Sequence, residues 1–246
     1  MTLAVQYIRS LLFILLVYLG MGVLGLVFAP AAYLSRNGAI LACKTFCVWA
    51  RWLARWLVGI RTEVRGAIPQ GEVMIAAKHQ SFLDIILIFH TVPRPKFIMK
   101  RELLWTPIIG IYAKRIGCIP VDRGKGGRAL AKMVKDVAVE FAEPGQLVIY
   151  PQGTRVAPGD YRPYKIGTGI LYDELDEPCY PAATNVGLFW PRKGILRKPG
   201  LAVVEFLEPI QPGMARDAFM TELEQRIEDG SKALMREAGF AADAMD

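Results

Sequence analysis

The chain has 246 residues, a formal net charge of +7 and 53% hydrophobic residues, and this length suffices for a full core without metals or disulfides. Its four cysteines show no CxxC spacing and its two histidines are too few for a zinc cluster, so we expect a reduced compartment and no metal site. Residues 1–65 hold seven basic residues against one acid, and the remainder is nearly balanced, which argues against the basic folded face of a nucleic-acid-binding protein.

The first predicted element is a long apolar helix. Residues 10–35 carry no formal charge and are rich in Leu, Val, Phe, Gly and Ala, enough to cross a bilayer core of about 30 Å. A signal peptide has an apolar core of about 7 to 15 residues and a more basic start than the single Arg9 found here. The segment is therefore predicted to be a retained membrane anchor.

Residues 40–60 predict a second helix that lies at the membrane interface. Indole rings favour the headgroup level and basic side chains attract anionic lipid. The first helix either spans the bilayer or forms a hairpin with the second in one leaflet, and the basic flank predicts that the rest of the chain is cytoplasmic. The sequence thus predicts a membrane-anchoring segment over residues 1–60 and a globular domain over residues 61–246. The residues of the interfacial pattern are Lys44, Trp49, Arg51, Trp52, Arg55 and Trp56.

The turn after the first predicted strand of the globular domain carries a histidine and an aspartate five positions apart. His79 follows the apolar run of residues 72–77, and Asp84 opens the next helix with Ser81 as its cap. Five positions on a continuous helix would diverge by about 140°, so the two side chains meet only if the turn folds the imidazole back. This layout is typical of a general base and its orienting carboxylate. His90 has no acid nearby and is interpreted as structural.

Short apolar runs alternate with amphipathic stretches through the rest of the chain, which predicts an α/β fold with a mixed, largely parallel sheet flanked by helices. Ligands in such folds gather where strands end and helices begin, as at His79. The predicted strands are 72–77, 96–99, 117–121, 146–150, 179–184 and 201–207, and the predicted helices are 82–91, 102–115, 127–142, 166–176 and 216–238.

Three further clusters follow predicted strands. The strand 117–121 ends in Asp122 and Arg123, and the strand 146–150 ends in the turn Pro151 to Arg155. In that turn a glycine permits close backbone approach and an arginine can bind phosphate oxygens with its forked donors. A third edge is supplied by residues 179–185.

In this order, and behind a membrane segment, these clusters resemble the bacterial lysophosphatidic acid acyltransferase family, within the glycerolipid acyltransferase superfamily. The family's His-x4-Asp block matches His79 and Asp84, and its second block matches residues 117–123, preceded by Lys100 to Leu103 and Pro107. Its Pro-Glu-Gly-Thr-Arg block matches residues 151–155, and its last, proline-bearing strand matches Tyr180-Pro181. The resemblance covers residues 60–210 well and the N-terminal helices loosely.

The resemblance implies an enzyme of the bacterial inner membrane, active on its cytoplasmic side, that moves an acyl group from acyl-CoA or acyl carrier protein to lysophosphatidic acid. His79 would be the base and Asp84 its orienting partner. No metal or other cofactor is implied, and the partners are membrane phospholipid, the acceptor lipid and the acyl donor, with no nucleic acid. The residues expected to bind substrate are Lys100, Arg123, Gln152, Gly153, Thr154 and Arg155.

The chain departs from the family pattern at Gln152, which stands where the family has glutamate. An amide keeps an acceptor oxygen and gains donors but loses the charge. Two alternatives remain open at this point. The acceptor is another lysolipid, such as the phosphate-free lyso-ornithine lipid, or the protein is a catalytically silent lipid-binding membrane protein.

Overall fold

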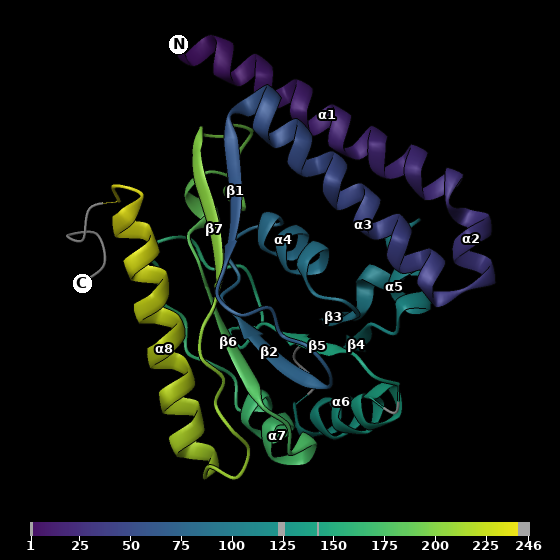
Figure 1. Cartoon of the computed structure of the whole chain (residues 1–246), viewed down its shortest axis with the longest axis vertical. Coiled ribbons are helices and arrows are strands. Elements are labelled where there is room, and N and C mark those ends of the chain that lie inside the picture. The colour runs from purple at the N-terminus through teal and green to yellow at the C-terminus, as the bar shows by residue number, and fades with distance from the viewer. Residues whose placement is uncertain (1, 123–125, 142, 241–246) are drawn as a thin grey trace.

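The computed structural model describes residues 2–122, 126–141 and 143–240. The strands within these ranges form one seven-stranded sheet in the order β1-β7-β6-β2-β5-β3-β4 (Figure 1). All neighbours are parallel except β6 and β7, which confirms the predicted mixed, largely parallel sheet. The strands are β1 (Ile60–Arg65), β2 (Val73–Ala77), β3 (Pro95–Lys100), β4 (Ile119–Val121), β5 (Gln146–Ile149), β6 (Cys179–Thr184) and β7 (Gly200–Phe206).

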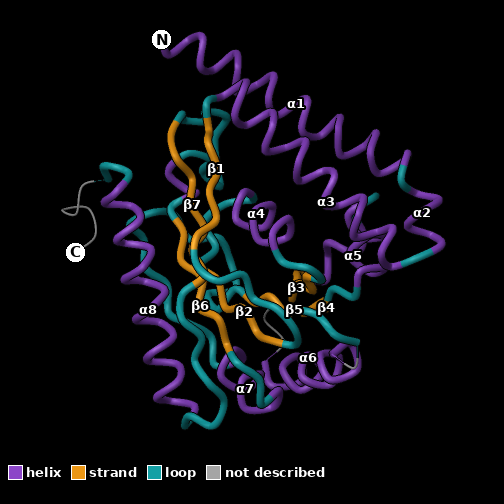
Figure 2. The backbone as a smooth tube through the Cα atoms, in the orientation of Figure 1, coloured by secondary structure: helices purple, strands orange, loops and turns teal. Residues whose placement is uncertain are grey.

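Helices cover both faces of this sheet (Figures 1 and 2). One face carries α4 (Leu83–Thr91), α5 (Ile109–Ile116) and the N-terminal helices, which share one hydrophobic cluster with it. The opposite face carries α6 (Gly126–Phe141), α7 (Gly167–Leu175) and α8 (Arg216–Glu237). The molecule is therefore a three-layer α/β sandwich.

The central strand β2 explains why the sheet needs both helical layers. All five of its residues are buried. Val73, Ile75 and Ala77 belong to the cluster under α4, whereas Met74 and Ala76 belong to the cluster under α6, α7 and α8. An unbroken apolar run is what a strand covered on both faces requires.

The N-terminal region forms the predicted helical hairpin. The helix α1 (Leu3–Val27) is joined through α2 (Ala29–Leu34) to α3 (Arg36–Leu53), which runs back beside it and ends in a π-helical turn, η1 (Ala54–Val58) (Figure 1). Only α1, among the described helices, is long and apolar enough to cross a membrane, with a mean hydropathy of 2.5 and 17% of that window buried. Its one buried face is fastened to the globular part by polar bonds. Gln6 donates to the carbonyls of Val58 and Arg197 at 3.1 and 2.7 Å, and Ser10 Oγ accepts the Arg197 N–H at 2.9 Å.

Two elements differ from the sequence-based prediction. Strand β1 is missing from the prediction, because only Ile60 and Val64 among its six residues are apolar and its pairing with β7 at the edge of the sheet is not visible in the sequence. The helix predicted over residues 102–115 is broken into a 3-10 turn, η2 (Arg101–Trp105), and α5. The break contains Pro107 and Ile108, whose φ of +67° is a costly conformation for a β-branched residue and interrupts any helix.

Candidate active site

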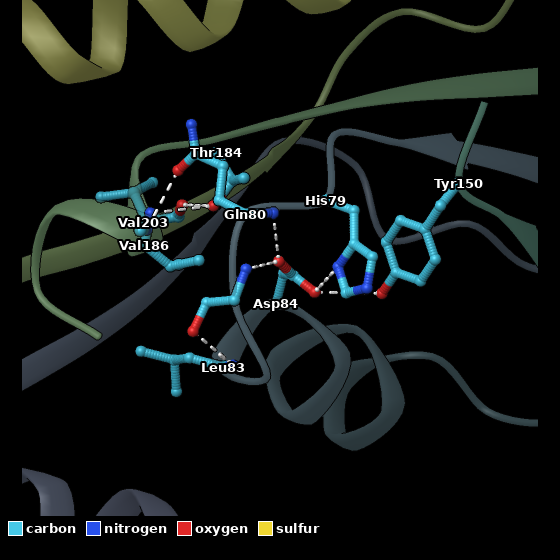
Figure 3. Close-up of polar contacts among 10 residues, drawn as sticks. His79, Gln80, Leu83, Asp84, Tyr150, Thr184, Val186 and Val203 are labelled. Carbon is cyan, nitrogen blue, oxygen red and sulfur yellow. Dashed lines mark hydrogen bonds and ion pairs between the residues drawn. The ribbon is translucent and has the colours of Figure 1, made fainter. Parts of the chain in front are cut away.

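The turn between β2 and α4 brings His79 and Asp84 into contact. His79 Nδ1 lies 2.9 Å from Asp84 Oδ1, so the turn folds the imidazole back over the first residues of the helix (Figure 3). Asp84 is fully buried and His79 is 9% exposed. Because an ionised carboxylate only accepts hydrogen bonds, Nδ1 carries the proton and Nε2 is the basic atom.

Four donors surround the Asp84 carboxylate. Oδ2 accepts the backbone N–H groups of Gln80 at 2.8 Å and Ser81 at 2.7 Å, and Oδ1 accepts from His79 and from the Tyr150 hydroxyl at 3.2 Å. Charge-assisted bonds of this kind stabilise a buried anion. The carboxylate is therefore held in one orientation, toward the imidazole.

The predicted helix cap is present in altered form. Asp84 accepts the Ser81 N–H, as a capping box requires, but Ser81 Oγ accepts from Leu83 N at 3.1 Å instead of from Asp84 N. The helix consequently begins at Leu83. Ser81 is fully buried, which suits a capping residue better than a nucleophile.

The turn after β5 lies against the histidine. The Val156 N–H donates to the His79 carbonyl at 2.8 Å, and Lys165 N donates to the Pro151 carbonyl at 2.9 Å. Gly153 has a φ of +67°, and a Cβ atom on it would lie 2.8 Å from Lys165 Nζ, so the turn requires glycine and the lysine side chain crosses it. Thr154 and Arg155 follow on the same turn, both half-buried.

This turn carries two basic side chains, Arg155 and Lys165. Within the described ranges, no acidic side chain forms an ion pair with Arg155 or Lys165. A guanidinium and an ammonium without a protein counterion suit a phosphate group. Lys165 belongs to no sequence motif, since it lies ten positions after Arg155 and reaches the turn only through the fold.

Gln152 points away from this cationic group. Its side chain is 2% exposed, and its Nε2 donates to the Arg162 carbonyl at 3.0 Å. Its Oε1 is buried and has no hydrogen-bond partner among the described residues. The amide therefore braces residues 162–165 beneath the turn, a bond that an ionised glutamate could not donate.

Lys100, which is also predicted to bind substrate, is less central. Lys100 ends β3 at the same edge of the sheet, but its ammonium is about half exposed and pairs with Glu102 at 3.0 Å. Arg123 lies outside the described residues. The structure thus assembles His79, Asp84 and the turn of residues 151–155, and leaves Lys100 toward the periphery.

The residues on either side of His79 point to the opposite face of the sheet. Lys78 is 3% exposed, and its Nζ lies 2.6 Å from both carboxylate oxygens of Glu228 on α8. Glu228 also accepts the Tyr164 hydroxyl at 2.9 Å. Gln80 Oε1 accepts from Gly187 N at 3.0 Å. The backbone on both sides of the histidine is therefore anchored by buried polar bonds.

Fold and site together define an α/β protein in which a histidine contacts a buried aspartate beside a turn that carries basic side chains, an arrangement typical of enzymes that use a general base. Among the described residues, no group of three or more His, Cys, Asp or Glu side chains could hold a metal ion.

Comparison with known proteins agrees with this class. The family model described as acyltransferase matches residues 60–185. A 1-acyl-sn-glycerol-3-phosphate acyltransferase from Pseudomonas aeruginosa is 30% identical over 91% of this chain and 89% of its own length. The alpha form of that enzyme from Homo sapiens is 28% identical over 74% of this chain and 66% of its own length.

A solved structure shows the same fold. The crystal structure of the 1-acyl-sn-glycerophosphate acyltransferase PlsC from Thermotoga maritima matches with a TM-score of 0.78, covering 93% of this chain and 97% of that chain at 21% identity. The protein accordingly belongs to the acyltransferase family, in the group of the 1-acylglycerol-3-phosphate acyltransferases.

Proposed function

We propose that this protein transfers a fatty acyl group from an acyl thioester to the free sn-2 hydroxyl of lysophosphatidic acid, forming phosphatidic acid. The observation that carries the proposal is the 2.9 Å contact between His79 and Asp84 beside a turn that bears Arg155 and Lys165. The printed names of the relatives from Pseudomonas aeruginosa and Homo sapiens support the same acceptor.

The proposed reaction needs one base and no covalent enzyme intermediate. His79 Nε2 takes the proton of the acceptor hydroxyl while its oxygen attacks the thioester carbonyl. The tetrahedral intermediate then collapses, the C–S bond breaks, and the leaving thiolate takes the proton from the imidazolium. Asp84 stabilises the imidazolium between these two proton transfers. The products are an ester and a free thiol, with acyl-CoA or acyl carrier protein as donor and no metal or other cofactor.

The acceptor phosphate is proposed to bind at the turn of residues 151–155. Arg155 and Lys165 supply positive charge and the hydroxyl of Thr154 supplies a donor, while Gly153 shapes the turn and uses its own N–H to donate to the Tyr150 carbonyl at 2.8 Å. Lys100 and Arg123 are proposed to complete the site. Fixing the phosphate brings the acceptor hydroxyl to the base, and such positioning contributes several kcal/mol, at best roughly 7 to 11, to lowering the barrier.

We further propose that α1 and α3 hold the domain on the cytoplasmic face of the inner membrane as a hairpin in one leaflet. The outward side of α1 exposes large apolar residues, including Leu11, Leu15 and Tyr18 at 52%, 62% and 66%. The other side of α1 is occupied by its bonds to Arg197, which a helix crossing the bilayer away from the domain would lose. A lipid acceptor would then reach the site without leaving the membrane surface.

A panel of acceptors tests the proposal. Vesicles containing the purified protein are incubated with labelled acyl-CoA or acyl carrier protein and with either lysophosphatidic acid or lyso-ornithine lipid. We expect acylation of lysophosphatidic acid that is absent in His79→Ala. Equal kcat/KM for the phosphate-free acceptor would contradict the phosphate site. No acylation of any acceptor would leave the silent lipid-binding alternative.

A further inference from the structure

Tyr150 lies directly over the imidazole of His79. It follows the last residue of β5, the strand beside β2, and it belongs to the same hydrophobic cluster as Val148. The two ring centroids are 3.9 Å apart and the ring planes differ by 19° (Figure 3). With a relative exposure of 7%, the phenol has little contact with water. The tyrosine ring therefore covers one face of the imidazole ring.

The hydroxyl of the same tyrosine donates to Asp84. It lies 3.2 Å from Oδ1, the oxygen atom that also accepts the His79 Nδ1 proton. Burial, and then the adjacent carboxylate, raise the pKa of Tyr150 well above its usual value, so the phenol stays neutral and remains a donor. One side chain therefore contacts both members of the pair.

Two constraints on the pair follow from this geometry. Rotation of the imidazole about its Cβ–Cγ bond would lose the parallel contact with the phenol ring. Rotation of the Asp84 carboxylate would break the phenol bond in addition to the two backbone bonds on Oδ2. Since proton transfer requires Nε2 to point at the acceptor hydroxyl, a fixed ring plane and a fixed carboxylate both favour the reactive geometry.

We propose that Tyr150 is a positioning residue of this site, whose ring fixes the plane of His79 and whose hydroxyl fixes the Asp84 oxygen that orients it. The proposal deepens the proposed function, because it rests on His79 being the base. Neither role was expected from the sequence, which assigned Tyr150 only to the end of a strand.

The alternative is that Tyr150 only fills space. Its ring also stacks on Phe97 at 6.2 Å, and a buried phenol needs some acceptor in any case. The two roles differ in what loss of the oxygen atom alone would do. A space-filling ring needs no hydroxyl, whereas a positioning tyrosine does.

The variant Tyr150→Phe keeps the ring and removes the hydroxyl. Tyr172→Phe is the matched control, because Tyr172 is also buried at 2%, stacks on Phe219 at 3.7 Å and donates to the Gln211 carbonyl, but lies in the cluster on the opposite face of the sheet. We expect Tyr150→Phe to lower kcat about five- to tenfold, the value of one hydrogen bond, with little change in either KM. Tyr172→Phe should lower stability without lowering kcat. Equal kcat in the wild type and Tyr150→Phe would overturn the proposal.

A second measurement needs no substrate, so it separates failure of this proposal from failure of the proposed function. The chain has two histidines, and 15N-histidine NMR of the protein in micelles would resolve the Nδ1 proton of His79 from His90. Burial, with Arg51 and Lys44 nearby, lowers the pKa of His90, so a neutral ring supplies an internal reference. We expect Tyr150→Phe to move the His79 Nδ1–H resonance and speed its exchange with water, and Tyr172→Phe to leave both unchanged. An unchanged His79 resonance in Tyr150→Phe would refute the positioning role even in an inactive protein.

Discussion

At the scale of single residues, the site depends on one buried carboxylate whose lone pairs are all used. Asp84 accepts two backbone N–H groups on one oxygen and two side-chain donors on the other. An asparagine of the same shape has one acceptor oxygen and an NH2 group in place of the second. In either orientation of the amide, its NH2 group faces groups that donate hydrogen bonds to the carboxylate in the wild type. The geometry thus makes the charge of Asp84, and not only its size, a requirement.

We therefore expect Asp84→Asn and His79→Ala to lose activity for different reasons. Removing the base should lower kcat by about 10²- to 10⁴-fold, and the amide should cost a similar factor because the imidazole loses its correct tautomer and partner. Acyl-transfer assays on protein whose circular dichroism matches the wild type would measure both. Turnover at the wild-type rate in His79→Ala would exclude His79 as the base, and the same result in Asp84→Asn would exclude the orienting role of Asp84.

Gln152 gives a second prediction at this scale. With glutamate at this position, the donor to the Arg162 carbonyl is lost and a carboxylate faces a carbonyl oxygen in a buried place. We expect Gln152→Glu to be destabilised by about 1 to 3 kcal/mol near pH 8, and less near pH 5, where a protonated carboxyl can donate again. Thermal unfolding at the two pH values would measure this. Equal stability at both would show that a cation has moved to pair with the new charge.

At the scale of elements, α8 supports the turn that carries His79 from the far side of the sheet. Successive side chains of an extended segment point to opposite faces, so His79 faces Asp84 while Lys78 and Gln80 face the other layer. Lys78 reaches Glu228 on α8, and the buried ion pair is completed by the Tyr164 hydroxyl. The position of the histidine is thereby tied to a helix about 150 residues away in sequence.

A double-mutant cycle tests this connection. Removing one partner of a buried pair leaves an uncompensated charge, which costs about 3 to 5 kcal/mol, whereas replacing both can be nearly neutral. We expect Lys78→Met and Glu228→Gln each to lower the free energy of unfolding more than the double variant does. Lys132→Met, at the exposed pair with Asp136, should change it by less than about 0.5 kcal/mol. Additive losses in the double variant would show that the two residues stabilise the fold separately.

Most elements could be predicted because periodicity carries local information. Strand β6 occupies the predicted residues 179–184, and the ends of the five other predicted strands differ from the observed ends by at most two residues. The charged edge strand β1 could not be predicted, because it is recognised only by its pairing with β7. The turn from β2 into α4 could be predicted because His79 and Asp84 are close in sequence. The places of Tyr150 and Lys165 could not be predicted, because the order of the strands and the packing of the loops bring these two residues to the site.

At the scale of the whole molecule, the apolar surface of the hairpin and the polar bonds beneath it restrict how the protein can meet a membrane. Apart from the exposed Arg9 near its start, the outward side of α1 is apolar, and Trp52 and Trp56 are exposed on the C-terminal part of the same hairpin at 53% and 68%. A helix that crossed the bilayer would have to release Gln6 and Ser10 from the loop at Arg197, leaving buried polar groups without partners. A hairpin lying in one leaflet keeps both the bonds and the lipid contact.

This geometry predicts that both ends of the protein lie on the same side of the membrane. Leu3, at the start of α1, is 64% exposed, and a cysteine placed there should react with a membrane-impermeant maleimide from the same side as a cysteine at Thr221 on α8. The four native cysteines are buried or half-buried, so the unsubstituted chain gives the background. Sealed vesicles with the domain facing outward should therefore show labelling of Leu3→Cys and Thr221→Cys alike. Labelling of Leu3→Cys only after the vesicles are opened would mean that α1 crosses the bilayer, and that Gln6 and Ser10 give up their bonds to the domain when the protein inserts.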